Sequence, residues 1–526
     1  ISEKKSGNDA PYGANNITIS NGATWRPVYD NRYGTDCVKS DAADAATKNL
    51  AANKVSERAT TYDTAGNKGT TITLNKDGII DLTWDGWTNG KYDTTRAYRT
   101  NGKQQTNTFR SLTVAKLDGS DGIIKVDSNL AKGLSDTLTV GAASTATSIK
   151  VQVNYDDFYA NSVKGDLVTG KALVVTDNSS GKNLTVSGTK SEYNEKTYNV
   201  TVEKDATETN KWNITKIEDI GGTPTPNITE NTRHAADSRD NVNNIWEIET
   251  NSLVKRLGDL RSMSKNTDKY DNMWAKYGHG TQEVGSSGRN TEVKYNQFQI
   301  GYDKLFARKD GKMYRGIMVS RINGDASYER GTGDTNSTTV GLYQAWLGNK
   351  GHFYDVTFRY GKISTDYSVT DLSDNYSTAD YSMWATTLSG EYGYRKDLGK
   401  GAYIEPSAEL ILGHVGSADY TTSKNMNVYL DATKHAITRL GFMAGKDFGK
   451  ANAYFKANYY HDFAGGGALT TGTVNYENDA AKNWEEIGIG GNVQLSKNAS
   501  AYAEVRKLFG NVKSNVNFSV GARWSF

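Results

Sequence analysis

The sequence of 526 residues is poor in cysteine, in proline and in long apolar runs. Its single cysteine, Cys37, excludes an internal disulfide and a cysteine-based metal cluster. No stretch approaches the roughly 18 consecutive apolar residues that a membrane-spanning helix requires. Only five prolines occur, and Pro224 and Pro226 fall together in GGTPTPNIT. Because proline cannot donate to a sheet ladder, this cluster predicts a linker.

An excess of charge of one sign is also missing, and so are histidines in the N-terminal part. The chain has 62 basic and 60 acidic residues, a net charge of +2, which argues against nucleic acid as a partner. The first of six histidines is His234, so residues 1–220 offer no Ser–His–Asp triad and no histidine-based zinc site. No G-x-S-x-G motif occurs there either. We predict that the chain is not an enzyme and binds no cofactor or metal.

The start, ISEKKSGNDAPYG, lacks the apolar segment of a signal peptide, which predicts a mature or truncated N-terminus. An enzymatic part outside this chain therefore stays open as an alternative.

Glycine and aromatic residues are abundant instead, with 53 Gly, 32 Tyr and 10 Trp. From about Tyr270 onward apolar and polar residues alternate, as in HFYDVTFRYGK, and this period of two predicts strands with two different faces. About twelve such segments, many of about ten residues or more, begin near Trp274, Tyr295, Tyr314, Thr339, Phe353, Tyr381, Tyr403, Ile437, Ala453, Trp484, Ala501 and Asn515. An even number of strands that can cross a bilayer at a tilt is typical of a closed outer-membrane barrel.

A soluble β-sandwich also alternates, but the character of the two faces favours the barrel. The polar faces carry charges that suit a wet lumen: Glu391, Glu405, Glu409, Glu486, Arg359, Arg439 and Arg523. The apolar faces are rich in Tyr and Trp, which suits the girdles at a membrane interface. Connections alternate between short ones and long polar ones, such as NGDASYERGTGDTNST and AGGGALTTGTVNYENDAAKN, as expected for periplasmic turns and external loops. We predict a 12-stranded antiparallel transmembrane β-barrel.

The C-terminal segment NVNFSVGARWSF shows the alternation most strictly. Its apolar positions include Phe518, Val520, Ala522, Trp524 and Phe526. An exposed edge strand would recruit other chains, whereas a barrel pairs its last strand with its first.

A helix is predicted just before the barrel. Residues 231–257 contain no Pro or Gly, and their apolar residues are spaced more widely than in a strand. A helix of roughly 20 to 25 residues would be about 30 Å long. It is too polar to face lipid, so we predict that it lies inside the barrel lumen, with an ordinary periplasmic linker helix as the alternative.

Residues 1–220 are rich in Thr, Asn, Gly and Asp and contain short strand-like pieces such as NNITISNGATW, TTITLNKDGIIDLTWDG and SIKVQVN. The spacing between pieces is often near the 20 to 25 residues of a solenoid rung. The Ala-rich stretch CVKSDAADAATKNLAANKVSER interrupts this pattern. The pattern predicts stacked rungs.

Three stretches resemble autotransporters, the monomeric type V secretion proteins of diderm bacteria. NVNFSVGARWSF resembles the family's signal for barrel assembly, so Phe518, Val520, Ala522, Trp524 and Phe526 would serve that role. LVKRLGDLRSM, followed by MWAKYGHG, resembles the junction between the lumenal helix and the first strand. FRSLTVAKLDGSDGIIKVDSNLAKGLSDTLTVG resembles a pertactin-like C-terminal passenger segment that acts as an autochaperone.

The resemblance implies an all-β chain in which a right-handed parallel β-helix precedes the barrel. The implied domains are a β-helical passenger at 1–107 with an irregular loop at 37–66, an autochaperone segment at 108–222, a linker and lumenal helix at 223–262, and a barrel at 263–526. Within the lumenal helix it singles out Lys255, Arg256, Asp259 and Arg261.

The implied function is secretion and display of the chain's own passenger, adhesin-like in character, at the bacterial surface. The implied partners are outer-membrane lipid, the barrel-assembly machinery and periplasmic chaperones, and a host or cell-surface ligand, and a monomer is expected. A general diffusion porin, a displayed hydrolase and a soluble secreted β protein are the alternatives.

Some members of the family cleave themselves at an Asn-Asn pair in the lumenal helix. Here TNSLVKRLGDLR places Asn251 at the first position but Ser252 at the second, and another pair, Asn243–Asn244, lies about two turns earlier. An uncleaved helix is the favoured interpretation, with Asn251 as the candidate nucleophile if cleavage occurs.

Overall fold

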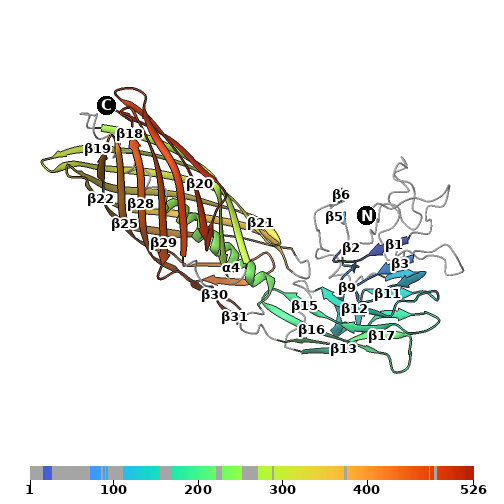
Figure 1. The fold of residues 1–526 in the computed structure, drawn as a ribbon. Helices are drawn as coiled ribbons and strands as arrows, with labels where there is room; N and C mark the ends of the chain where they lie inside the picture. Colours follow the sequence, from blue (N-terminus) through green and yellow to red (C-terminus); the bar gives the residue numbers. More distant parts are fainter. Residues whose placement is uncertain are drawn as a thin grey trace. The chain divides into compact units, whose positions relative to one another are not determined.

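The computed structural model describes residues 16–25, 71–83, 87–88, 91–92, 111–154, 167–220, 228–251, 271–286, 289–371, 376–472, 474–478 and 483–526 (Figure 1). These residues belong to two compact units, one up to Glu230 together with Thr370–Tyr376, and one comprising Asn231–Val369 and Ser377–Phe526. Cys37 and the predicted loop 37–66 lie outside the described residues.

The N-terminal unit is built from short strands that pair in parallel. One sheet contains β1 (Asn16–Ile19), β3 (Thr71–Leu74) and β8 (Lys116–Asp118). A second contains β2 (Thr24–Trp25), β4 (Ile79–Asp81), β9 (Gly122–Asn129), β12 (Ser148–Asn154) and β14 (Thr185–Gly188), with β10 (Leu134–Ser135) paired to β9. A third contains β7 (Ser111–Val114), β11 (Thr137–Val140) and β13 (Leu167–Asp177).

Equivalent apolar residues stack in register along these sheets. In the second sheet Ile80 pairs with Ile124, and Ile124 pairs with Val151. In the third sheet Leu112 pairs with Leu138. Each apolar ladder is buried in a core shared by all three sheets. Stacking of this kind is the arrangement of a parallel β-helix, in which each rung contacts only its neighbours. The predicted right hand of the coil stays a prediction.

The C-terminal end of the β-helix changes from parallel to antiparallel pairing. Strands β15 (Lys190–Tyr193), β16 (Lys196–Lys204) and β17 (Lys211–Asp219) continue the third sheet by pairing β17 with β13. Their apolar side chains Val200, Ile214 and Ile217 join the core. The antiparallel strands therefore cover this end of the coil. The remaining described elements are a 3-10 turn, η2 (Leu130–Lys132), and a short hairpin of β5 (Trp87–Thr88) and β6 (Lys91–Tyr92).

The C-terminal unit is a closed antiparallel barrel of twelve long strands within the described residues (Figure 1). They are β18 (Asp271–Ser286), β19 (Arg289–Arg308), β20 (Gly311–Tyr328), β21 (Gly331–Gly348), β22 (His352–Thr370), β23 (Tyr376–Tyr394), β25 (Ala402–Val415), β28 (Thr433–Asp447), β29 (Ala451–Asp462), β32 (Asn483–Gln494), β33 (Ala499–Gly510) and β35 (Asn517–Ser525). Two short strands, β24 (Lys396–Gly399) and β34 (Val512–Lys513), pair at the rims.

The first and last long strands pair with each other, which closes the sheet. Met273 lies opposite Trp524 and Ala275 opposite Ala522, and the backbone N–H of Phe526 donates to the Asp271 carbonyl at 2.9 Å. The barrel prediction is confirmed, and the sandwich alternative is excluded because the described long strands form one sheet that closes on itself.

Two predicted long loops are wrong in detail. In NGDASYERGTGDTNST the strands β20 and β21 continue through the polar residues and leave only Glu329–Arg330 between them. The region of AGGGALTTGTVNYENDAAKN contributes to a separate antiparallel sheet of β26 (Ala418–Thr421), β27 (Asn427–Leu430), β30 (Gly467–Thr471) and β31 (Val474–Asn478). This sheet has its own apolar face, because Val428, Leu430 and Leu469 are fully buried.

The helix α4 (Glu230–Asn251) has 22 residues, as predicted for this stretch, and it lies inside the barrel (Figure 1). Within the described residues, no helix is both long and apolar enough to cross a membrane. The barrel encloses α4 because an α-helix with its side chains is about 10 to 12 Å wide, which the interior of a twelve-stranded barrel accommodates.

Candidate functional site: the barrel lumen

The two faces of the barrel wall differ in chemistry as the alternation predicts. Large apolar side chains on the outer face are strongly exposed, for example Ile317 at 57%, Leu342 at 58% and Ile489 at 61%. The seven charged residues predicted for the inner face are all buried: Glu391, Glu405, Glu409, Glu486, Arg359, Arg439 and Arg523. Apolar residues outside and charges inside are the arrangement of a barrel with lipid around it and a polar lumen.

Most of α4 is polar, yet the helix is buried along nearly its whole length. Its buried polar residues include Thr232, His234, Ser238, Arg239, Asn241, Asn244, Glu247 and Glu249. Burying polar groups is costly unless they are hydrogen-bonded, so such a helix requires a polar surround. The polar side chains of the barrel lumen supply these hydrogen-bond partners.

Glu249 is an acid of the helix that several wall side chains contact. Its carboxylate accepts hydrogen bonds from Ser320 at 2.9 Å and Ser337 at 2.7 Å, and from the Gln297 amide at 3.3 Å. The Arg359 guanidinium lies 3.5 Å from the same carboxylate. These partners lie on β19, β20, β21 and β22, so one helix residue connects four neighbouring strands.

Trp246 connects the helix to another part of the wall. Its indole N–H donates to the Thr387 hydroxyl at 2.8 Å, and its ring stacks on His435 with centroids 4.3 Å apart. The His435 Nδ1 atom lies 2.7 Å from the Asp462 carboxylate. Trp246 thereby contacts β23 and β28, and the imidazole that it stacks on is itself fixed by β29.

Further bonds extend along the N-terminal half of the helix. Ser238 exchanges a hydrogen bond with the Tyr381 hydroxyl at 2.9 Å, and Arg239 donates to the Ala468 carbonyl at 2.9 Å. The Asn244 amide donates to the Gln282 carbonyl of β18 at 3.0 Å. The helix therefore contacts a run of neighbouring strands from β18 to β23 and also β28, which identifies it as a plug and excludes the periplasmic linker helix.

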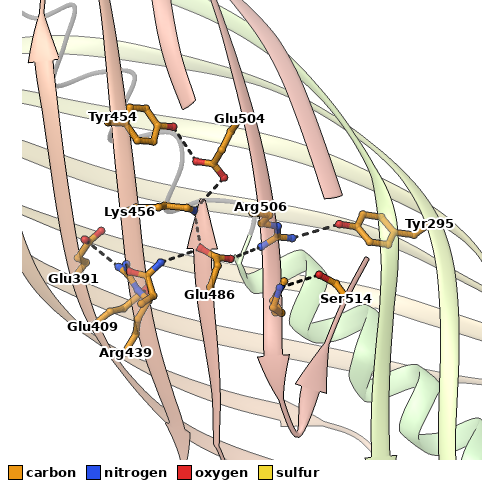
Figure 2. A network of polar contacts seen from close by, with 12 residues as sticks. Tyr295, Glu391, Glu409, Arg439, Tyr454, Lys456, Glu486, Glu504, Arg506 and Ser514 are labelled. Atoms are coloured by element: carbon orange, nitrogen blue, oxygen red, sulfur yellow. Dashed lines mark hydrogen bonds and ion pairs between the residues drawn. The ribbon is translucent and has the colours of Figure 1, made fainter. Parts of the chain in front are cut away.

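A network of buried charges lines the wall formed by β23 to β33 (Figure 2). Arg439 contacts Glu391 at 3.0 Å and Glu409 at 2.8 Å. Lys456 contacts Glu486 at 2.7 Å and Glu504 at 3.0 Å. Asn458 joins the two halves, because it accepts a hydrogen bond from Arg439 and donates one to Glu486.

Arg506 and Tyr295 complete the network. Arg506 contacts Glu486 at 3.0 Å and donates to the Tyr295 hydroxyl at 3.4 Å. Figure 2 shows Tyr295 pointing toward Arg506 from another part of the wall, while Arg506 and Glu486 come from the neighbouring strands β33 and β32. Since each charge has a partner of opposite sign, the network fixes the lumenal side chains in one arrangement.

Inward aromatic rings rest against glycines on the next strand. Tyr403, Tyr454 and Tyr502 lie directly opposite Gly445, Gly490 and Gly521. A Cβ added to any of these glycines would come within 2.5 Å of the facing tyrosine side chain. Trp274 with Gly301, and Tyr343 with Gly316, repeat the pattern. The glycines are therefore needed because only a hydrogen leaves room for the ring.

The sequence-predicted site residues fall into three groups. Phe518, Val520, Trp524 and Phe526 lie on or beside β35, and 41%, 46%, 54% and 50% of their surfaces are exposed on the outer face, with Ala522 on the same face. Asn251 is the last residue of α4. Lys255, Arg256, Asp259 and Arg261 lie outside the described residues.

The contacts made by Trp246 and Glu249 were not predicted from the sequence. The presence of a single large aromatic ring in a mostly polar helix was the available signal for Trp246. For Glu249 the signal was weaker, because Ser320, Ser337 and Gln297 are ordinary inward positions of their strands. Among the described residues, no group of three or more His, Cys, Asp or Glu side chains is placed to hold a metal ion.

The barrel is similar in sequence to the β-domains of known proteins. Residues 273–506 match the family model described as "Autotransporter beta-domain". The pertactin autotransporter of Bordetella parapertussis is 28% identical over 290 residues, which cover 54% of this chain and 31% of that protein. The BrkA autotransporter of Bordetella pertussis is 24% identical over 428 residues, covering 80% of this chain and 40% of that protein.

The crystal structure of the β domain of the Bordetella autotransporter BrkA matches 49% of this chain and 100% of that domain, with a TM-score of 0.42 and 24% identity. The chain spans less than half the length of the curated relatives described above.

Proposed function

We propose, from the premise that the C-terminal barrel is an autotransporter β-domain of the bacterial outer membrane, that this chain secretes and displays its own N-terminal β-helix. The observation that carries the proposal is the position of α4. The helix directly follows the β-helical unit in sequence and lies within the barrel that begins 20 residues after it, at Asp271. A chain threaded in this way has its N-terminal unit and its barrel connected through the lumen.

Folding of the β-helix would supply direction to the transport. Each rung exposes an apolar face that the next rung buries, so folding outside the barrel makes a return into the lumen unfavourable. The segment 108–222 is the part that would fold first and act as the autochaperone. Its antiparallel end, β15 to β17, supports this role because it covers one end of the core without needing a further rung.

We propose an adhesive role for the displayed β-helix and no catalytic one. The absence of histidine before His234 removes the usual general base from residues 1–220. A displayed hydrolase would need an active part outside this chain. The expected partner is a ligand at a host or cell surface, and the barrel-assembly machinery and periplasmic chaperones are the expected partners during biogenesis.

The porin alternative predicts a different ion conductance for the intact protein. A porin keeps an open lumen, whereas α4 occupies the lumen of this barrel. Intact protein in planar bilayers should show little conductance, and deletion of residues 230–251 should produce large channels. Large conductance in the intact protein would favour the porin.

Self-cleavage is a separate hypothesis, and we propose that α4 stays uncleaved. Electrophoresis of membranes from wild-type cells should show one band of full length. Two fragments that meet near Asn251, and that disappear in Asn251→Ala, would instead identify Asn251 as the nucleophile.

The display proposal is tested by fractionation and by protease shaving of whole cells. The chain should fractionate with the outer membrane and show heat-modifiable electrophoretic mobility. External protease should remove residues before about 230 and leave the barrel intact. Protection of those residues in intact cells would contradict display.

A further inference from the structure

The outer wall carries a groove across strands β19 to β22. Its volume is about 580 Å³. Its apolar lining is formed by Tyr302, Ile317, Leu342, Val356 and Phe358. These side chains belong to the lipid-facing set, since each is 38% to 58% exposed. An acyl chain of the surrounding bilayer can therefore lie in this groove, which we also call the trough.

A cation lies at the border of this groove. Arg315 lines it, and its Nε atom donates to the Gln344 side chain at 2.8 Å. Among the ion pairs between described residues, none involves Arg315. Lys304 lies directly opposite Arg315 in the strand register, also on the exposed face. On its other side Lys304 lies opposite Asp271 in the strand register, and Asp271 accepts a hydrogen bond from the Tyr302 hydroxyl. The three charged groups Arg315, Lys304 and Asp271 together carry a net charge of +1.

Aromatic residues indicate the depth of this cation in the membrane. Arg315 is the fifth residue of β20, close to the short turn at Lys309–Asp310. Trp346 and Tyr354 lie nearer that end of their strands and stack with centroids 5.6 Å apart. Aromatic girdles lie at the membrane interface, so Arg315 lies on the hydrocarbon side of the girdle. A cation there is costly without a counter-charge, and Arg binds phosphate through two parallel hydrogen bonds.

We propose that this groove binds one anionic phospholipid of the periplasmic leaflet. The phosphate contacts the Arg315 guanidinium, which retains free N–H donors beside its bond to Gln344, and Lys304 adds a second positive charge. One acyl chain lies in the trough between Ile317, Leu342 and Phe358. The short turns place this end of the barrel at the periplasm, where the leaflet consists of phospholipid. The proposal rests on the outer-membrane location and is independent of the display of the β-helix.

Native mass spectrometry of the full chain in detergent tests the site. The protein is supplied with phosphatidylglycerol, or with phosphatidylcholine, which has a phosphate but no net charge. Wild-type protein should retain one phosphatidylglycerol in preference to phosphatidylcholine. Arg315→Gln should lower that retention about tenfold, and Arg315→Lys should lower it less because the charge remains. Leu342→Trp should also lower it by filling the trough.

Arg321→Gln is the matched control. Arg321 lies on the outer face of the same strand, but it donates to Asn323 and Thr338 and does not line the groove. Its loss should leave retention unchanged. Heat-modifiable mobility of each variant shows that the barrel is folded. Equal retention of the two lipids, unchanged retention in Arg315→Gln, an equal loss in Arg321→Gln, or retention of lipopolysaccharide alone would each overturn the proposal.

Discussion

Glu249 carries its carboxylate into a part of the lumen where four wall side chains converge on it. A buried charge of this kind adds little net stability when it is paired, but removing one partner leaves the others desolvated without compensation. Single residues in the lumen therefore decide whether α4 stays in the pore.

We expect Glu249→Leu to loosen the plug. It removes the acceptor that Ser320 and Ser337 share and the charge opposite Arg359, at a cost of about 3–5 kcal/mol. Channel openings in planar bilayers should become more frequent. Glu249→Gln keeps an oxygen acceptor and should show a smaller increase. Conductance equal to wild type in Glu249→Leu would contradict the role of Glu249 in holding the helix.

Asp205 makes the end of the β-helix sensitive to acid. The Lys171 ammonium, together with the backbone N–H groups of Glu208 and Thr207, holds the pKa of Asp205 well below its usual value. Because the folded-state pKa is depressed, the ionised carboxylate stabilises the fold above about pH 4. That contribution is lost as the pH falls below about 4.

We expect Asp205→Asn to lower the stability of the turn between β16 and β17 at pH 7 and to have a smaller effect near pH 2. The protein is equilibrated in urea at a series of pH values and then labelled by a short hydrogen-exchange pulse at one fixed pH. The urea midpoint for residues 198–219 reports the stability of the turn. A difference between variant and wild type that does not change with pH would contradict the ionic role of Asp205.

At the scale of elements, the strands were predictable wherever they contact lipid. Twelve segments were predicted and twelve long strands are observed, and most predicted starts lie within six residues of the observed ones. The largest difference is at β21, predicted from Thr339 and observed from Gly331. The residues GTGDTNST have no apolar face, because that part of the strand carries none of the lipid-facing side chains that produce the alternation.

The plug helix was predictable as an element but its contacts were not. Absence of Pro and Gly, together with the change of spacing, gave a helix close to the observed Glu230–Asn251. Which wall residues contact it depends on the tilt and stagger of twelve strands, which the alternation does not encode. The charged inward positions were foreseen singly, whereas the pairing of Arg439 with Glu391 and Glu409 was not.

The ring-and-glycine pairs join neighbouring strands. We expect Gly521→Ala to destabilise the barrel by about 1–3 kcal/mol, because the new Cβ would lie 2.2 Å from the Tyr502 ring. Gly390→Ala is the control, since a Cβ there meets nothing within 4 Å. The temperature at which electrophoretic mobility shifts measures both. Equal midpoints for the two variants would show that Tyr502 adapts without cost.

At the scale of the whole molecule, the chain combines two folds with different requirements. The β-helix has a continuous apolar core, whereas the barrel is apolar outside and polar inside. The pattern of residues 1–220 predicted stacked rungs, and the described residues confirm parallel stacking. The irregular spacing of the strand-like pieces did not reveal the antiparallel strands at the end of the coil.

We expect a core substitution in the β-helix to stop display without stopping barrel insertion. Val174 is fully buried, and Val174→Asp places an unpaired charge in the core. The variant should keep heat-modifiable mobility, but external protease should no longer remove its β-helix from whole cells. Thr169→Asp, at an exposed position of the same strand, should behave as wild type. Normal display of Val174→Asp would show that transport does not depend on folding of the β-helix.

The pairing of β35 with β18 joins two strands that are about 250 residues apart in the chain. In the closed barrel this seam has the same antiparallel hydrogen bonding as the other pairs of neighbouring strands. The seam is therefore not a weaker line along which the wall would separate. Sideways escape is thus confined to the interval before the seam forms. Once the seam has formed, a polypeptide can leave the lumen only along the barrel axis, and α4 occupies that path.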